Sequence, residues 1–251
     1  MNRYAENRRF LKSNFSEFAT LKTDKMKGTP KPPEFKPYEP DSQIIDLPAV
    51  TENILTTQNI YTCIKERRST RFYSSEHLSL AELSYLLWAT QGVTGVKGGL
   101  TLRTVPCSGA THSFETYLLI RNIETIAQGL YRYLPQEHKL LLISKLEEIE
   151  HKINQITLDQ PFVPRFASKA AVLFIWSTTP YRSEWKYDLT AHKKILIDVG
   201  HVCQNLYLAS ESIGAGTCAI GIYDQALIDQ ILGLDGEEEF VLYLAAVGKK
   251  Q

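Results

Sequence analysis

A proline-rich stretch near the N-terminus divides this chain into two unlike parts. Five of the 11 prolines lie between Pro30 and Pro40, in TPKPPEFKPYEP. Proline has a fixed φ and no backbone N–H, so this density excludes both helix and central strand. We therefore predict an extended N-terminal arm over residues 1–50 and a folded domain over residues 51–251. The arm is expected to be either a flexible tail or a segment that crosses a neighbouring subunit, since its aromatic side chains favour burial.

The composition of the chain excludes several classes of protein. Hydrophobic residues make up 43% and charged residues 22% of the sequence, as in folded globular proteins. The 28 basic and 28 acidic residues cancel, so the net positive charge of a nucleic-acid binder is missing. No apolar run approaches the roughly 18–20 residues that span a bilayer. We expect no nucleic-acid or membrane partner.

Cysteine and histidine spacing argues against a metal site. Cys63, Cys107, Cys203 and Cys218 are far apart and form no CxxC pair, and the histidines have no metal-ligand spacing. The charged N-terminus is not followed by the apolar segment of a signal peptide. We therefore expect a cytoplasmic protein with reduced thiols and no metal.

Hydrophobic periodicity and turn signals predict irregularly interleaved helices and strands. A Ser79–Glu82 capping box starts a helix that Gly92 stops, and Asp224 caps another that ends at Gly233. Further helices are predicted over 52–66, 144–158 and 189–213. Strands are predicted over 115–121, 130–133, 139–143, 170–177 and 240–248, with a glycine-rich loop at 92–99 and a polar loop around 185–187. One strand pair has hairpin spacing, so the pattern favours an α+β fold with a mixed sheet.

Three arginines within five residues form the first candidate site. Arg67, Arg68 and Arg71 surround Ser69 at the end of a predicted helix. Guanidinium groups match phosphate geometry and a hydroxyl adds a donor, so the segment is typical of a phosphate clamp. The alternative is a solvated basic helix end, where cations also complement the helix dipole.

Three further segments are candidates, each with a plain structural alternative. Small residues in 103–112 permit close approach of a flat ligand, or form an ordinary loop, and Cys107 has no base beside it in sequence. The glycines of 214–221 follow a helix rather than a strand, so a Rossmann site is excluded. Lys186 and Tyr187 are a candidate base and acid, or part of an exposed loop.

Taken in order, these segments resemble the FMN-dependent nitroreductase superfamily, and more closely its SagB/ThcOx-type dehydrogenase branch. The resemblance covers roughly residues 60–250. It rests on ERRSTRFY, PCSGATHSFETY, GLYRYLPQEHKL, the WKY segment, DVGHVCQNLYLASESIGAG, TCAIGIYD and a terminal AVGK. It implies a three-layer α/β/α fold with a mixed, mostly antiparallel sheet wrapped by helices. It also implies a homodimer with FMN at the subunit interface.

The resemblance also implies roles for individual residues. Lys186 and Tyr187 match a pair of residues that is associated with removal of the substrate proton. We expect cationic Lys186 to lower the pKa of the Tyr187 phenol. The residues that match cofactor contacts are Arg67, Arg68, Ser69, Arg71 and Lys249 for the phosphate end, with Pro106, Cys107, Ser108, Gly109, Ala219, Ile220 and Gly221 for the flavin ring.

The function implied is hydride transfer from a heterocyclic, azoline-like substrate to FMN. That substrate is a peptide or a small molecule. One alternative is a nitro- or quinone reductase on the same fold that takes NAD(P)H as electron donor. Another is a flavin-binding module without turnover.

Overall fold

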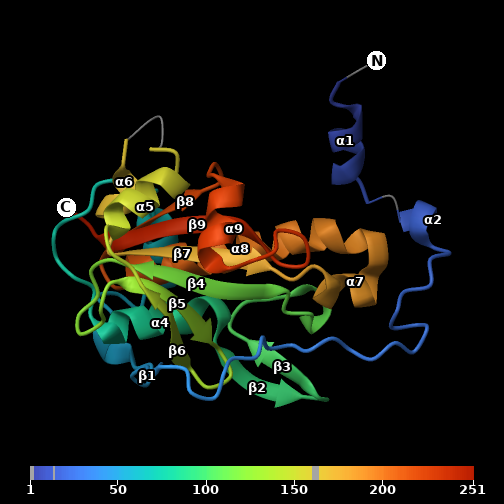
Figure 1. Ribbon diagram of the computed structural model, residues 1–251, viewed down its shortest axis with the longest axis horizontal. Helices are drawn as coiled ribbons and strands as arrows, with labels where there is room; N and C mark the ends of the chain where they lie inside the picture. Colours follow the sequence, from blue (N-terminus) through green and yellow to red (C-terminus); the bar gives the residue numbers. More distant parts are fainter. Residues whose placement is uncertain (1–2, 14, 160–163) are drawn as a thin grey trace.

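A seven-stranded sheet forms the centre of the protein (Figure 1). The computed structural model describes residues 3–13, 15–159 and 164–251. Every pairing between the named strands of this sheet is antiparallel, which confirms the mostly antiparallel arrangement. Parallel pairing is found only as isolated bridges in the described residues, one of them between Ser69 and Thr217. In spatial order the strands are β1 (Ile44–Asp46), β6 (Lys139–Lys145), β5 (Gly129–Leu134), β4 (Phe114–Ile120), β7 (Val172–Thr178), β9 (Phe240–Lys249) and β8 (Ala215–Ile220).

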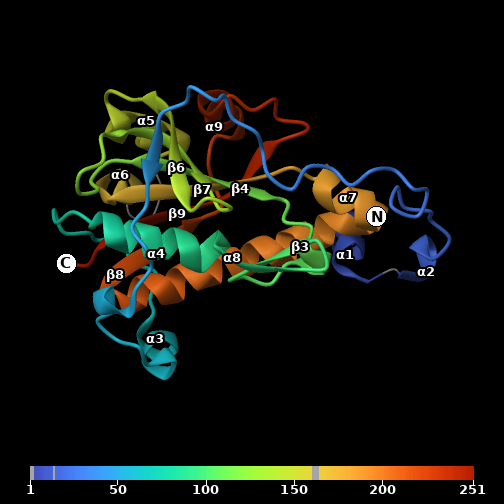
Figure 2. The same ribbon diagram turned by 90° about the horizontal axis from the view of Figure 1, so that it is seen from below.

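Helices cover both faces of the sheet, so the expected α/β/α layering is confirmed (Figure 2). One face packs against α4 (Leu80–Gln91) and the 22-residue α8 (Ala191–Ser212), with Phe174 and Trp176 in the shared core. The other face packs against α5 (Ile149–Ile156), α6 (Phe166–Lys169) and α9 (Gln225–Leu232). Across the described ranges, no helix combines the length and the apolar character that a membrane span needs.

Local capping signals place several helices where the sequence predicts them. The Ser79 hydroxyl accepts from the Glu82 N–H, and the Glu82 carboxylate accepts from the Ser79 N–H, so the capping box starts α4. The Asp224 carboxylate accepts from the Leu227 N–H at the start of α9. Gly233 ends α9 in the left-handed region with φ 69°.

Two segments differ from their predicted loops. The glycine-rich loop is a hairpin of β2 (Val93–Lys97) and β3 (Leu100–Arg103), because Gly98 and Gly99 both take the positive φ that a tight hairpin turn needs. The segment around residues 185–187 belongs to α7 (Tyr181–Tyr187). Pro180 precedes this helix with a helical φ of −56°, so it favours helix initiation rather than a loop.

The first fifty residues are not extended throughout. They contain α1 (Ala5–Leu11) and α2 (Phe15–Phe18), and β1 pairs with β6 at the edge of the sheet. Between these elements the arm runs along its own subunit, beside α7 and β3 (Figures 1 and 2). The predicted helix over 52–66 is likewise divided into a short 3-10 turn, Glu52–Ile54, and α3 (Ile60–Glu66), because Asn59 caps only the second part.

Candidate functional site

Tyr207 of α8 joins the arginine segment to the sheet edge. Its hydroxyl lies 3.1 Å from Ser69 Oγ and accepts from the Ala219 N–H at 2.9 Å. The Arg67 guanidinium lies over the Tyr207 ring, 5.2 Å from its centroid. The structure therefore brings together Arg67, Ser69 and Ala219 as the sequence predicts. Tyr207 itself was missed, because the sequence does not show that its hydroxyl meets Ser69 and the Ala219 N–H in the folded chain.

The three arginines of this segment have no carboxylate partner in the described part of the chain. Arg68 Nη1 donates to the carbonyls of Lys65 and Arg67, and its side chain is exposed. Arg71 lies 5.8 Å from the Phe166 ring, which belongs to the core on the other side of the sheet. Arg67 and Arg71 thus lie in different surroundings, and the compact part of the predicted clamp is Arg67 with Ser69.

The chain end and the end of β8 complete this side of the site. Lys249 forms an ion pair with Glu82, and so the charge of Lys249 already has a partner. Ile220 is buried as the last residue of β8. Gly221 follows it, is exposed, and has nothing within 4 Å of the position that a Cβ would occupy. A flat ligand therefore has open access to the backbone at Gly221.

A buried carboxylate holds the loop that contains Pro106, Cys107 and Ser108. Asp198 of α8 accepts from the Ser108 N–H at 2.8 Å and from the Ser108 hydroxyl at 3.0 Å. The Cys107 thiol lies 3.5 Å from the same carboxylate, and Pro106 is exposed beside it. Three donors from one loop thus converge on one acceptor. Asp198 was also missed, since an acidic residue within an amphipathic helix predicts a solvent-facing position.

The predicted Lys186–Tyr187 pair contacts this loop. Lys186 Nζ donates to the Gly109 carbonyl at 2.8 Å. Gly109 has φ 61°, and a Cβ there would overlap both Tyr187 Oη and Lys186 Nζ. A side chain at position 109 would therefore have to displace the ends of both side chains, and the positive φ also favours glycine there. The structure brings together the predicted base, the predicted acid and the predicted ring-lining loop.

Burial shifts the pKa values of this group in opposite directions. Desolvation lowers the pKa of Lys186, and the nearby cations Lys25 and Lys31 of the arm add to the effect. Desolvation raises the pKa of Tyr187, and Cys107 and Asp198 raise it further. The expectation that Lys186 lowers the Tyr187 pKa is therefore wrong, because burial and neighbouring acidic groups dominate. Burial, with Asp198, also raises the pKa of Cys107, so its thiol stays protonated and is a poor nucleophile.

The two groups of side chains lie on opposite flanks of α8. Asp198 and Tyr207 are nine residues apart in this helix. That separation is about 13 Å along the axis and about two and a half turns around it. The Asp198 group and the Tyr207 group are thus held on opposite sides of one helix within a single copy of the chain.

Comparisons with known proteins agree on one family. The sequence model described as "Nitroreductase family" matches residues 64–249. A Methanocaldococcus jannaschii protein named as a nitroreductase is 34% identical over 210 residues, which cover 84% of this chain and 98% of that protein.

Solved structures share the fold. A Ralstonia eutropha structure named as a nitroreductase has a TM-score of 0.67 and 24% identity, covering 86% of this chain and 94% of that one. An Anabaena variabilis structure named in the same way has a TM-score of 0.69 and 21% identity over 84% of this chain, which spans 42% of that chain. A chain of the E. coli microcin synthetase McbBCD complex, solved with truncated pro-MccB17 bound, has a TM-score of 0.63 and 17% identity, covering 94% of this chain and 86% of that chain.

The pKa shifts predict that Lys186 reacts with acetic anhydride at a lower pH than Lys27. Only the neutral amine reacts, and burial lowers the pKa of Lys186, whereas the hydrogen bond to Asp24 raises the pKa of Lys27. Between about pH 8 and 10, a larger fraction of Lys186 is therefore neutral. Peptide mass spectrometry after competitive labelling measures both midpoints in one sample. A midpoint for Lys186 at or above that of Lys27 would contradict this assignment.

Proposed function

This chain belongs to the nitroreductase family of oxidoreductases, and we propose that it is an FMN-dependent dehydrogenase that takes hydride from an azoline-like heterocycle. The proposal is carried by one contact, the hydrogen bond from Lys186 to the carbonyl of Gly109. This contact places a base of lowered pKa against the loop that resembles the flavin-lining loop of the family.

The residues around Tyr207 suit the phosphate and ring of FMN. Arg67 and Arg68 have no carboxylate partner among the described residues, so their charge is available to a dianionic phosphate. The Ser69 hydroxyl adds a polar contact beside them. Gly221 leaves its backbone open for a flat ring. Arginine forks and open backbone are the chemistry that a flavin mononucleotide needs.

The position of the two groups on α8 supports a site shared between two copies of the chain. The phosphate group around Tyr207 and the loop group around Asp198 lie about 13 Å apart along the helix and on opposite flanks. A second copy related by a two-fold axis brings the loop of one copy to the phosphate group of the other. The exposed apolar side chains of Ile60, Tyr61 and Ile64 on α3 are 60%, 70% and 60% exposed, as expected of a surface that a partner covers. We therefore propose a homodimer.

In this arrangement the chain supplies proton transfer and orientation. Bound FMN provides the two-electron acceptor. Lys186, with its lowered pKa, is the base that removes the substrate proton, and the Gly109 carbonyl fixes the direction of its amine. Tyr187 remains a neutral phenol because burial raises its pKa, so it serves as a hydrogen-bond donor to the substrate.

A second candidate function is reduction of nitro compounds or quinones with NAD(P)H. It is favoured by the 34% identity to a protein named as a nitroreductase. The two functions differ in what they require of Lys186. Removal of a proton from carbon or nitrogen needs a base, whereas reduction of a nitro group or quinone by the flavin does not need this side chain.

We predict that Arg67→Ala weakens FMN binding by about 10- to 100-fold, the loss expected for one hydrogen bond to a charged phosphate. Fluorescence quenching of added FMN measures the dissociation constant. Lys65→Ala is the matched control, since Lys65 is a cation only two residues away in sequence and pairs with Glu66. Unchanged affinity in Arg67→Ala would remove Arg67 from the cofactor site.

Mixed dimers test whether each site is built from two copies. Arg67→Ala damages the phosphate side, and Pro106→Trp fills the loop side from an exposed position. When differently tagged chains carrying one change each are co-expressed and purified as pairs, one of the two sites contains both changes and the other contains neither. The mixed dimer should then bind one FMN, while each parent variant binds little. A mixed dimer that binds none would place both groups in the same site of one copy.

Lys186→Ala should leave FMN bound but slow the oxidation of a thiazoline or oxazoline test compound by about 10²- to 10⁴-fold, the usual loss on removal of a general base. Reduction of a quinone with NAD(P)H in the same variant serves as the control reaction. If the variant oxidises the azoline as fast as the parent, or if the parent reduces only quinones, the dehydrogenase proposal fails and the second candidate takes its place.

A further inference from the structure

The loop beside Lys186 has a strained backbone. Gly109, Ala110 and His112 all take positive φ, at 61°, 53° and 48°. Left-handed conformations are costly for residues with a Cβ and persist only where surrounding contacts fix them. The contacts around this loop therefore decide whether Gly109 offers its carbonyl to Lys186.

Contacts from α7, α8 and β3 hold the strained loop. Asp198 of α8 holds Ser108, and Arg182 of α7 donates to the His112 carbonyl at 3.2 Å. The His112 N–H donates to Cys107 Sγ at 3.2 Å. The His112 ring Nε2 lies 3.0 Å from the Thr101 carbonyl in β3. The position of β3 thus determines where the His112 ring lies.

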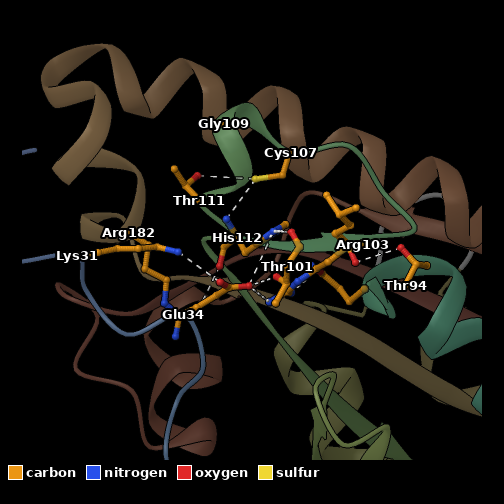
Figure 3. Close-up of polar contacts among 12 residues, drawn as sticks. Lys31, Glu34, Thr94, Thr101, Arg103, Cys107, Gly109, Thr111, His112 and Arg182 are labelled. Carbon is orange, nitrogen blue, oxygen red and sulfur yellow. Dashed lines mark hydrogen bonds and ion pairs between the residues drawn. The ribbon is translucent and has the colours of Figure 1, made fainter. Parts of the chain in front are cut away.

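The N-terminal arm reaches β3 through one carboxylate, that of Glu34 (Figure 3). Glu34 accepts from the Thr101 hydroxyl and lies 3.7 Å from the Arg103 guanidinium. The Arg103 side chain is only 1% exposed and that of Glu34 11%. The Phe35 ring packs near the same guanidinium, 5.5 Å from its Cζ. The arm therefore supplies a carboxylate to a buried arginine, and the same carboxylate also pairs with Lys31 of the arm at 3.3 Å.

Arg103, rather than His112, is the partner that needs this charge. Burial, together with the Arg103 cation, lowers the pKa of His112 to about 4, so its ring is neutral near pH 7. A neutral ring that faces a carbonyl must carry its proton on Nε2 and donate to Thr101. The contact of 3.9 Å between Glu34 Oε1 and His112 Nε2 is therefore not an ion pair, because the ring is neutral. Another buried arginine next to the loop, Arg182, is paired with Glu115 at 2.7 Å.

We propose that Glu34 is a positioning residue of the active site, which holds β3 and the His112 ring so that the strained loop keeps Gly109 in reach of Lys186. The inference rests on the proposed function, because it is Lys186 and the loop that would act on substrate. The family match begins at residue 64, so the arm and Glu34 lie outside it. Glu34 thereby makes the first part of this chain a component of the site rather than a tail.

Hydrogen exchange of the loop amides tests this role without any substrate. In Glu34→Gln, the Ser108 and His112 amides should exchange at least about tenfold faster, because a buried arginine left without its countercharge destabilises its surroundings. Lys36→Met is the matched control. It removes the arm's 2.6 Å ion pair with Glu239, whose carboxylate is about as buried as that of Glu34 and does not touch the loop. The protein is used as purified, and its flavin content is measured in the same samples.

Faster loop exchange in Glu34→Gln, with parent-like exchange in Lys36→Met, supports the proposal. Parent-like exchange in Glu34→Gln overturns it, and so does an equal increase in both variants, since arm attachment alone would then explain the effect. If Glu34→Gln does not fold, Thr101→Val replaces it, because this variant removes only the hydroxyl that donates to Glu34. Faster loop exchange in Thr101→Val then supports the proposal, and parent-like exchange overturns it. A protein without bound flavin would refute the proposed function, but the comparison of loop amide exchange between the variants would still test the role of Glu34.

Discussion

The buried face of α8 is the constraint on which the rest of the site depends. This helix packs its apolar side against the sheet, and two polar side chains leave it on opposite flanks. Tyr207 binds Ser69 and the Ala219 N–H, and Asp198 binds the N–H and hydroxyl of Ser108. Because the hydrophobic packing fixes the helix, it also fixes both polar groups and the distance between them. The proposed homodimer rests on this division, because a two-fold partner would bring the loop of one copy to the phosphate group of the other.

Charge is buried next to the reactive loop, and the fold neutralises it with partners from distant parts of the chain. Arg182 pairs with Glu115 of β4, whereas Arg103 pairs with Glu34 of the arm. Leaving a buried cation unpaired destabilises the fold by more free energy than one hydrogen bond contributes, so these partners are needed for a stable loop. Desolvation also lowers the pKa of Lys186 and raises that of Tyr187. The pKa of Lys186 is therefore shifted in the direction that the proposed proton removal requires.

The sequence predicts those parts of the fold that depend on neighbouring residues. The Ser79–Glu82 box and the Asp224–Gly233 helix lie where local capping rules put them. Asp198 and Tyr207 could not be predicted, because their partners are 90 and 138 residues away in sequence. The predicted direction of the Tyr187 pKa shift was wrong for the same reason, since Cys107 and Asp198 approach the phenol only in the folded chain. The resemblance to a family supplied the grouping of the site segments, which spacing alone left open.

The proposed function requires that this protein holds FMN non-covalently. The visible spectrum of the purified protein and of the filtrate after boiling tests this, with the released pigment identified by mass and its amount compared with that of the chain. We expect flavin bands that pass into the filtrate and FMN close to one molecule per chain. A colourless protein that also takes up no added FMN would rule out the FMN-dependent function.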